Sequence, residues 1–156
     1  MCGIAGIIDY RGKPVSKPVV ESMLCAINYR GPDESGIYLS RYAGLGNVRL
    51  SIIDLSTGQQ PLSDLSGRYW IVFNGEIFNY RELREGLTSK GYNLKTHSDT
   101  EVLVQLYALY GKDALSMLNG QFAFAIWDKV KEELFIARDR IGIRPVFYHH
   151  SAEGFS

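Results

Sequence analysis

The sequence predicts an α+β protein in which β-sheets stack on one another and helices flank them. One observation is the stretch QFAFAIWD, residues 121–128, which is apolar at every position from 122 to 127. A strand of this kind is covered on both faces. The other is a set of amphipathic helical patterns, such as Leu103, Leu106 and Tyr107, which repeat with a period of about 3.6 residues. Covered strands together with one-sided helices favour a layered packing.

Length and composition limit the function classes. The chain has 156 residues, which suits one domain with a substantial core. Lys plus Arg and Asp plus Glu both total 17, so bulk charge does not favour binding to nucleic acid or to acidic membranes. No apolar run is long enough to span a bilayer, and no secretory signal opens the chain. Two cysteines are few for a disulfide scaffold, which favours a reducing cytoplasm.

The first third of the chain predicts strands around one helix. GIAGIID, residues 3–9, is typical of a strand. Ser16 and Pro18 indicate a helix start, and the apolar positions that follow lie on one helical face. Cys25 lies next to that face and is interpreted as a small packing residue. Residues 36–40 and 44–54 then resemble two strands.

The rest of the chain alternates strands and helices. The apolar, β-rich segment YWIVFN, residues 69–74, predicts a strand. Asn79 can cap a helix that ends near Gly91, and the capping-box pattern SDTE, residues 98–101, starts another. A short helix over residues 113–118 and strands over 121–128, 133–139 and 144–150 complete a prediction of three or four helices and about eight strands.

Cys2 is the first candidate for chemistry. No Walker A, HExxH or CxxC motif occurs, so phosphate-loop and zinc chemistry lack support, and no metal site is expected. Removal of Met1 would place the Cys2 thiol beside a free α-amine whose ordinary pKa is roughly 8, close to that of a thiol. An amine of this kind is a known activating base for N-terminal nucleophiles. The alternative is a small residue that merely opens a strand.

Asn74–Gly75 allows two interpretations. Asn-Gly is a strong signal for a hairpin turn. However, the residues that follow lead into a helix and not into a return strand. A carboxamide beside a glycine N–H also forms a good pair of donors for a developing oxyanion, which acyl transfer from a thiol requires.

Arg49 and Asp99 form a second candidate pair. Each has an ordinary structural interpretation, Arg49 as a surface strand residue and Asp99 as a favourable charge in the first turn of a helix. Together they could also bind an amino acid, because Arg would hold its carboxylate and Asp its ammonium group.

The chain resembles the class II glutamine amidotransferase domain, an N-terminal-nucleophile hydrolase, and most closely that of glutamine-hydrolysing asparagine synthetases. The resemblance covers nearly the whole chain in order. It is carried by MCGIAG at 1–6, RGPDESG at 30–36, RLSIIDLSTGQQPL at 49–62, NGEIFNY at 74–80, SDTEVL at 98–103, NGQFAFAIWD at 119–128 and ARDRIGIRP at 137–145. It departs from the family at Tyr29 and at Asn47, where histidines are usual nearby.

The resemblance implies a four-layer α/β/β/α sandwich and a glutaminase activity that yields glutamate and ammonia through a thioester. It implies roles for eight residues: Cys2 as nucleophile, Asn74 and the Gly75 N–H as oxyanion hole, Arg49 for the glutamine carboxylate, Asp99 for its ammonium group, and Leu50, Ile52 and Glu76 as further pocket residues. The RGPD loop is expected to lie close by, without an assigned step.

The resemblance also implies that residues 1–156 are the N-terminal, C-terminally truncated part of a longer protein. The expected partners are L-glutamine and a C-terminal synthetase domain that receives the ammonia, with no nucleic acid or membrane and a homodimer left open. No cofactor is expected here, because ATP and Mg²⁺ belong to the synthetase domain. Two alternatives remain open: an amidotransferase domain that serves another acceptor, and a non-catalytic module that binds amino acids.

Overall fold

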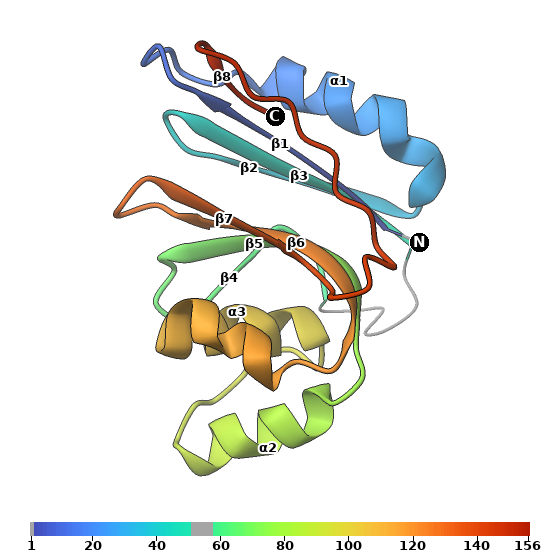
Figure 1. Cartoon of the computed structure of the whole chain (residues 1–156), viewed down its shortest axis with the longest axis vertical. Coiled ribbons are helices and arrows are strands. Elements are labelled where there is room, and N and C mark those ends of the chain that lie inside the picture. The colour runs from blue at the N-terminus through green and yellow to red at the C-terminus, as the bar shows by residue number, and fades with distance from the viewer. Residues whose placement is uncertain (1, 51–57) are drawn as a thin grey trace.

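A computed structural model describes residues 2–50 and 58–156 and shows four stacked layers (Figure 1). One helix lies outside the first sheet, and two helices lie outside the second, so the α/β/β/α sandwich is confirmed. The described helices are α1 Lys17–Ile27, α2 Tyr80–Ser89 and α3 Asp99–Tyr110, with 3₁₀ turns η1 Asn28–Arg30 and η2 Gly111–Met117. The described strands are β1 Gly3–Asp9, β2 Glu34–Leu39, β3 Ala43–Arg49, β4 Leu62–Ser63, β5 Tyr69–Ile77, β6 Gly120–Asp128, β7 Glu133–Arg138 and β8 Gly154–Phe155.

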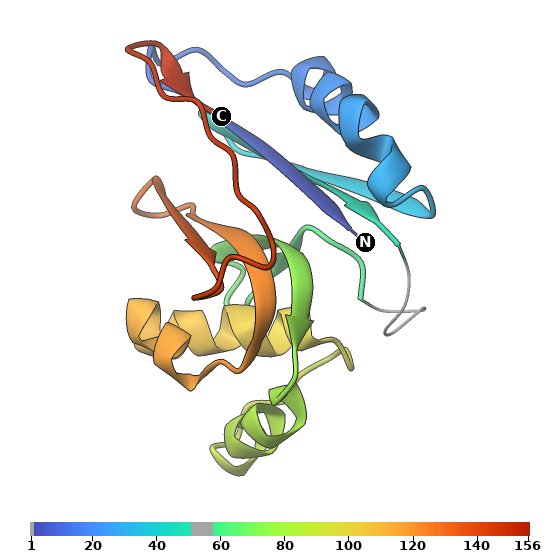
Figure 2. The same cartoon turned by 45° about the vertical axis from the view of Figure 1, so that its right-hand side comes forward.

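Both sheets are antiparallel. The first has the order β2-β3-β1-β8, and the second has the order β4-β5-β6-β7. After β7 the chain crosses from the second sheet to the first, where β8 pairs with the end of β1 (Figure 2). The two sheets are therefore joined along one side by residues 139–153.

Three apolar clusters fill the three interfaces between the layers. Val20 and Leu24 of α1 pack against Val48 on the outer face of the first sheet. A second cluster, which includes Leu45 and Trp127, lies between the sheets. The third and largest lies between the second sheet and the helices α2 and α3.

The alternation in β6 explains how one strand serves two of these clusters. Phe122, Phe124 and Ile126 belong to the cluster beneath the helices, whereas Ala125 and Trp127 belong to the cluster between the sheets. The prediction that both faces of this strand are covered is confirmed.

Three predictions about local structure are wrong. Residues 144–150 form no strand within the described chain, and Phe147 and Tyr148 are 89% and 72% exposed because no sheet covers them. Asn74–Gly75 makes neither a hairpin turn nor a strand end, since β5 continues to Ile77. Cys25 is exposed and not packed, because it lies one residue, or about 100° of helical rotation, beyond the buried Leu24.

The predicted strand over 44–54 ends at Arg49 in the described part, and residues 51–54 lie outside it. Four chain segments then meet at one end of the sandwich. They are the start of β1, the end of β3, the last third of β5 and the first residue of α3 (Figure 1).

Candidate active site

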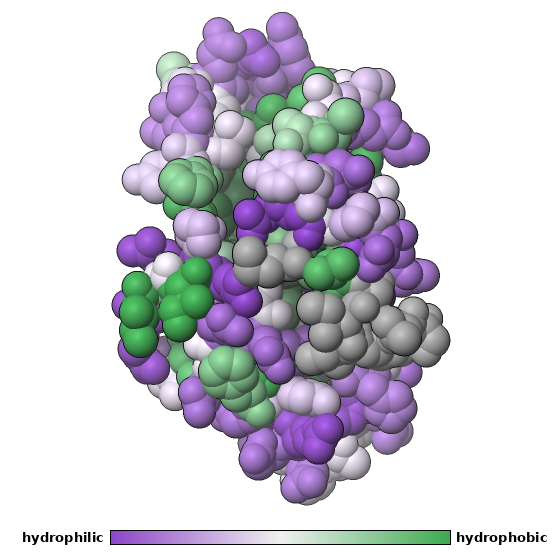
Figure 3. Space-filling model, turned by 90° about the vertical axis from the view of Figure 1, so that its right-hand side faces the viewer, coloured by the Kyte–Doolittle hydropathy of each residue, from purple (hydrophilic) through white to green (hydrophobic). Residues whose placement is uncertain are grey.

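A cavity of about 170 Å³ opens at this end of the molecule. Its walls bring together seven of the eight predicted site residues: Cys2, Arg49, Leu50, Asn74, Gly75, Glu76 and Asp99. The eighth, Ile52, lies outside the described residues. Figure 3 looks onto this end and shows strongly hydrophilic residues near the middle of the face. Residues far apart in sequence thus share one polar pocket.

The position of Cys2 follows from the pairing of β1 with β3. Gly3 pairs with Val48, so the same antiparallel register places Cys2 opposite Arg49. The Cys2 Sγ lies 3.9 Å from the carbonyl oxygen of Leu50, a distance that allows only a weak thiol hydrogen bond. Around the thiol, the Arg30 Nε donates to the Cys2 carbonyl at 3.3 Å and the Asn47 Nδ2 donates to the Gly3 carbonyl at 3.2 Å.

The RGPD loop is fastened to the end of β3. The Asp33 N–H donates to the Arg49 carbonyl at 3.1 Å. A Cβ on Gly31 would lie 2.6 Å from the carbonyl oxygen of Val48, so only glycine permits this approach. Since Arg30 also bonds the Cys2 carbonyl, the loop supports the backbone of both Cys2 and Arg49. The expectation that it lies near the site is confirmed.

Arg49 is a buried cation with a carboxylate partner. Its side chain is 6% exposed, and its Nη1 lies 2.9 Å from Glu34 Oε2 across the β2–β3 pair. The interpretation as a surface residue with its head in water is therefore wrong. A buried guanidinium held on one side by a carboxylate keeps a fixed orientation toward the cavity.

Asn74, Gly75 and Glu76 line the cavity from within β5. Gly75 pairs with Phe122 of β6, and a Cβ on Gly75 would lie 2.1 Å from the Gln121 carbonyl oxygen. Any larger residue would push the two strands apart. The backbone at Gly75 is thus held tightly against β6, beside the carboxamide of Asn74, which is 6% exposed.

Asp99 is the first residue of α3, and it lies against β5. Its Oδ2 accepts a hydrogen bond from the Ile77 N–H at 3.1 Å, and it is 6% exposed. Burial raises the pKa of Asp99 above its ordinary value, and the charge of nearby Glu76 adds to this rise, while backbone N–H groups oppose it. An ammonium group in the cavity would relieve this electrostatic cost.

The capping box at α3 is confirmed in part. The Ser98 side chain accepts from the Glu101 N–H at 3.2 Å, as predicted. The Glu101 carboxylate instead accepts from the N–H groups of Lys95 and Thr96, at 2.8 and 2.7 Å. This carboxylate therefore fixes the segment that precedes α3, and with it the position of Asp99.

Six further residues line the cavity without having been predicted: Gly58, Gln60, Phe73, Ser98, Thr100 and Arg144. Gln60 links two walls, because its Oε1 accepts from the Phe73 N–H at 2.7 Å and its Nε2 donates to the Thr100 hydroxyl at 3.3 Å. Five of the six lie within the motifs GQQPL, SDTE and GIRP, and Phe73 lies in the strand segment YWIVFN, but nothing in a single sequence marks any of them as a pocket residue.

The described residues offer neither a cluster of metal ligands nor a membrane-spanning helix. Residues 2–50 and 58–156 contain no group of three or more His, Cys, Asp or Glu side chains placed to hold a metal ion. Over the same ranges, no helix is both long enough and apolar enough to cross a membrane.

Comparison with known proteins decides the family. A protein-family model described as "Glutamine amidotransferase domain" matches residues 1–156. The chain belongs to the class II glutamine amidotransferase domain family. The amidotransferase domain is 46% identical over 153 residues to asparagine synthetase [glutamine-hydrolyzing] 1 of Bacillus subtilis, covering 95% of this chain and 24% of that protein. It is 38% identical over 156 residues to asparagine synthetase B [glutamine-hydrolyzing] of Escherichia coli, covering 99% of this chain and 28% of that protein.

The fold of the amidotransferase domain has a solved counterpart. Glutamine phosphoribosylpyrophosphate amidotransferase from B. subtilis superposes with a TM-score of 0.80 at 24% identity, covering 99% of this chain and 41% of that one. This likeness confirms the N-terminal-nucleophile hydrolase fold. The chain spans about a quarter of the length of the two asparagine synthetases, 24% and 28%.

Proposed function

We propose that this domain hydrolyses L-glutamine to glutamate and ammonia through a thioester on Cys2. The observation that carries the proposal is the cavity of about 170 Å³ that gathers a thiol, a guanidinium, a carboxamide and a carboxylate from four separate chain segments. The cavity suits a ligand of amino-acid size. Its groups match those that glutamine offers: a carboxylate, an ammonium group and an amide.

Arg49 and Asp99 would hold the amino-acid end of glutamine. The guanidinium of Arg49 pairs with the substrate carboxylate, and Asp99 pairs with the ammonium group. Glu34 already holds one edge of Arg49, so the guanidinium needs little reorganisation on binding. Leu50 and Glu76, which also line the cavity, would complete the contacts.

The first half-reaction breaks the side-chain amide. The α-amine of Cys2 takes the thiol proton, and the thiolate attacks the amide carbon to form a C–S bond. Asn74 and the Gly75 N–H stabilise the negative oxygen of the tetrahedral intermediate. As this intermediate collapses, the C–N bond breaks and the protonated α-amine gives its proton to the departing nitrogen, which leaves as ammonia.

The second half-reaction restores the enzyme. Water loses a proton to the α-amine and attacks the thioester carbon, and the C–S bond then breaks. The products are glutamate and free Cys2. Amine, thiol and water supply every proton and electron pair, so the proposed steps use no cofactor.

The parent enzyme would use the ammonia on an activated carboxylate. The two relatives named as asparagine synthetases support aspartate as acceptor and a synthetase domain as the partner of this domain. A different acceptor is the alternative, because acceptor choice belongs to that second domain. Cys2 and Cys25 are both free thiols, which supports a cytoplasmic location.

A glutaminase assay tests the proposal. Met1-free protein is incubated with L-glutamine, and ammonia and glutamate are measured together. Cys2→Ala should abolish release of both, whereas Cys25→Ala should retain most of it, because Cys25 lies on the exposed face of α1. A folded wild-type protein that binds glutamine without releasing ammonia would favour a non-catalytic amino-acid-binding module instead.

A further inference from the structure

The loop between β7 and the last segment is organised by one carboxylate. Asp139 directly follows β7 and is 5% exposed. Its two oxygens accept hydrogen bonds from five backbone N–H groups at 2.7–3.2 Å. These belong to Phe122, Ile141, Gly142, Ile143 and Arg144. A single side chain therefore sets the course of residues 139–144.

The carboxylate of Asp139 stays charged over the whole range in which the domain would work. Burial alone would raise its pKa, but the hydrogen bonds from Ile143, Arg144, Phe122 and Gly142 outweigh burial and lower the pKa to about 2. The ionised carboxylate is thus the stable form of Asp139 at neutral pH, and both of its oxygens accept hydrogen bonds from the loop.

Asp139 also attaches the loop to the strand beside Gly75. The Phe122 N–H donates to Asp139 at 3.1 Å, and the Asp139 N–H donates to the Phe122 carbonyl at 2.8 Å. Phe122 is the partner of Gly75 in the β5–β6 pair. The loop therefore starts next to the backbone that is expected to bind the oxyanion.

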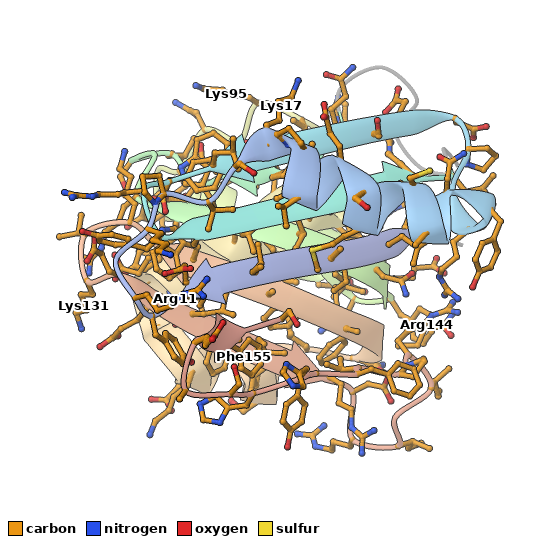
Figure 4. All side chains as sticks on the ribbon, turned by 90° about the horizontal axis from the view of Figure 1, so that it is seen from above. Arg11, Lys17, Lys95, Lys131, Arg144 and Phe155 are labelled. Carbon is orange, nitrogen blue, oxygen red and sulfur yellow. The ribbon has the colours of Figure 1, made fainter. Side chains whose placement is uncertain are left out.

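The same loop delivers Arg144 to the cavity. The Arg144 side chain is partly buried and lines the pocket together with Cys2, Asn74 and Gly75. Figure 4 shows Arg144 at the end of the molecule where β1 begins, which is the end that carries the thiol. The loop of Arg144 follows β7 of the second sheet, whereas Arg49 lies at the end of β3 in the first sheet. The pocket thus has a guanidinium on each of two walls.

We propose that Arg144 is a further catalytic residue of the glutaminase reaction and that Asp139 is its positioning residue. This inference rests on the proposed function. Arg49 is assigned to the α-carboxylate. The backbone N–H of Arg144 is held by Asp139, which also bonds Phe122, the partner of Gly75, so we assign the Arg144 side chain to the amide end of the substrate. The amide is neutral in glutamine, and negative charge appears on its oxygen in the tetrahedral intermediate and on the new carboxylate of glutamate.

A guanidinium at the amide end acts mainly in the transition state. Charge-assisted N–H bonds to a negative oxygen are stronger than bonds to a neutral amide oxygen. Arg144 should therefore raise kcat more than it tightens glutamine binding. It should also hold the product glutamate through its second carboxylate.

The first test replaces Arg144 in Met1-free protein. Arg144→Gln should lower kcat about 10- to 100-fold, with KM for glutamine changed less than about threefold. Arg144→Lys keeps the charge and should recover part of kcat. The same Arg144→Gln variant should bind glutamate more weakly in competition assays. Arg140→Gln, an exposed arginine of the same loop, is the matched control and should behave as wild type.

The second test replaces the positioning residue. Asp139→Asn should lower kcat, as Arg144→Gln does. The kcat of the double variant should be only slightly lower than that of Arg144→Gln alone, because both changes act through one guanidinium. Asp128→Asn is the control. Asp128 is an equally buried aspartate that accepts from N–H groups of its own turn, so it should cost stability without lowering kcat of folded protein.

The outcomes separate this inference from the proposed function. If wild-type protein releases ammonia and Arg144→Gln matches Arg140→Gln in kcat and in glutamate inhibition, the role of Arg144 is wrong and the glutaminase proposal stands. A large rise in KM at unchanged kcat would also overturn it, since that result describes ground-state binding. If trimmed wild-type protein is inactive, both proposals fail.

Discussion

Among single residues, Asn74 is the one whose replacement should lower turnover most clearly without preventing binding. Its carboxamide is proposed to stabilise a negative oxygen that exists only during the reaction. Losing one preorganised donor of an oxyanion hole typically costs about 100- to 1,000-fold in turnover. We expect Asn74→Ala to lose kcat by that order while glutamine still binds. Asn93→Ala, an exposed asparagine, is the control. A loss of tenfold or less, about 1.4 kcal/mol or less, would mean that Asn74 only completes the pocket wall.

Asp99 should lower the stability of the empty fold and strengthen the binding of glutamine. Its pKa is raised by burial, with Glu76 adding to the rise, so the ionised carboxylate is disfavoured in the empty fold. A raised folded-state pKa means that the stability of the native protein falls as pH rises from the unfolded value, 3.8, through the folded one. We therefore expect Asp99→Asn to be more stable than wild type at pH 7 and equal to it below pH 3.8.

The measurement is urea unfolding of both proteins across this pH range, with glutamine binding followed by calorimetry. Asp99→Asn should also lose most glutamine binding, because the ammonium group loses its partner. Asp113→Asn, on an exposed turn, should change neither quantity. A variant that is less stable at pH 7, or that binds glutamine normally, would contradict the assignment.

Residue type and resemblance predicted the reactive groups of the site but not their supports. Cys2, Arg49 and Asp99 carry groups whose chemistry can be recognised in a sequence, and all three line the cavity. Gln60 and Arg144 do not stand out in this way. Their roles arise only when long-range contacts bring Gln60 against β5 and α3 and bring the loop after β7 against β6.

At the scale of elements, the β5–β6 pair depends on Gly75. A methyl group there would lie 2.1 Å from the Gln121 carbonyl oxygen. We expect Gly75→Ala to destabilise the domain by about 1–3 kcal/mol, as overpacking does, and to lower activity by moving the oxyanion donors. Urea unfolding and the glutaminase assay measure the two effects.

Gly86→Ala provides the matched control. Gly86 lies inside α2, and an added Cβ would meet no atom within 4 Å. Alanine there should stabilise the domain by about 0.5–1 kcal/mol, because glycine loses more backbone entropy in a helix. If Gly75→Ala proved as harmless as Gly86→Ala, the close contact between β5 and β6 would not constrain the site.

Elements were predictable where one local pattern decides them. Ser98 caps α3 as its motif indicates, and β1 has the predicted bounds. Asn79 precedes α2 as predicted, but its side chain bonds to Met117 and Asn119 instead of capping the helix. Residues 144–150 include Val146, Phe147 and Tyr148, which favour strands, and yet the segment forms no strand, because pairing depends on neighbours that composition does not specify.

For the whole molecule, one ion pair should account for part of the stability that is lost in acid. The side-chain hydrogen bond from Arg68 lowers the pKa of Asp128 from 3.8 to about 2 and joins the start of β5 to the end of β6. A depressed folded-state pKa gives stability that is complete above pH 3.8 and is lost as pH falls toward 2. Asp128→Asn should thus cost about 2 kcal/mol at pH 7.

Urea unfolding at several pH values checks this expectation. The difference between wild type and Asp128→Asn should shrink as pH falls from 3.8 to 2. Glu133→Gln, which changes the exposed partner of Asp128 in the β6–β7 pair, should show no such trend. A difference that stays constant down to pH 2 would mean that packing, and not the charge of Asp128, stabilises the contact between the start of β5 and the end of β6.

The layers of the whole molecule were predictable because burial leaves a pattern in the sequence. A strand that is apolar on both faces, as β6 is, requires a neighbour on each side, and the one-sided helices supply the outer layers. The strand order β2-β3-β1-β8 was not predictable from these patterns. It depends on which edges meet, and short strands such as β4 and β8 carry too few residues to show a period.

In the proposed reaction Cys2 attacks glutamine with its own α-amine as base, and the presence or absence of Met1 tests this role of the amine. Met1 lies outside the described residues, but its chemical effect is simple. While Met1 is attached, the nitrogen of Cys2 is an amide without a basic lone pair, so the thiol has no proton acceptor.

The measurement pairs intact mass with ammonia release, before and after treatment with methionine aminopeptidase. We predict that protein bearing Met1 is folded and nearly inactive. Glutaminase activity should appear as the intact mass falls by the mass of one methionine residue. If protein that fully retains Met1 released ammonia from glutamine as fast as the trimmed form, the α-amine would not be the base, and the account given for Cys2 would be wrong.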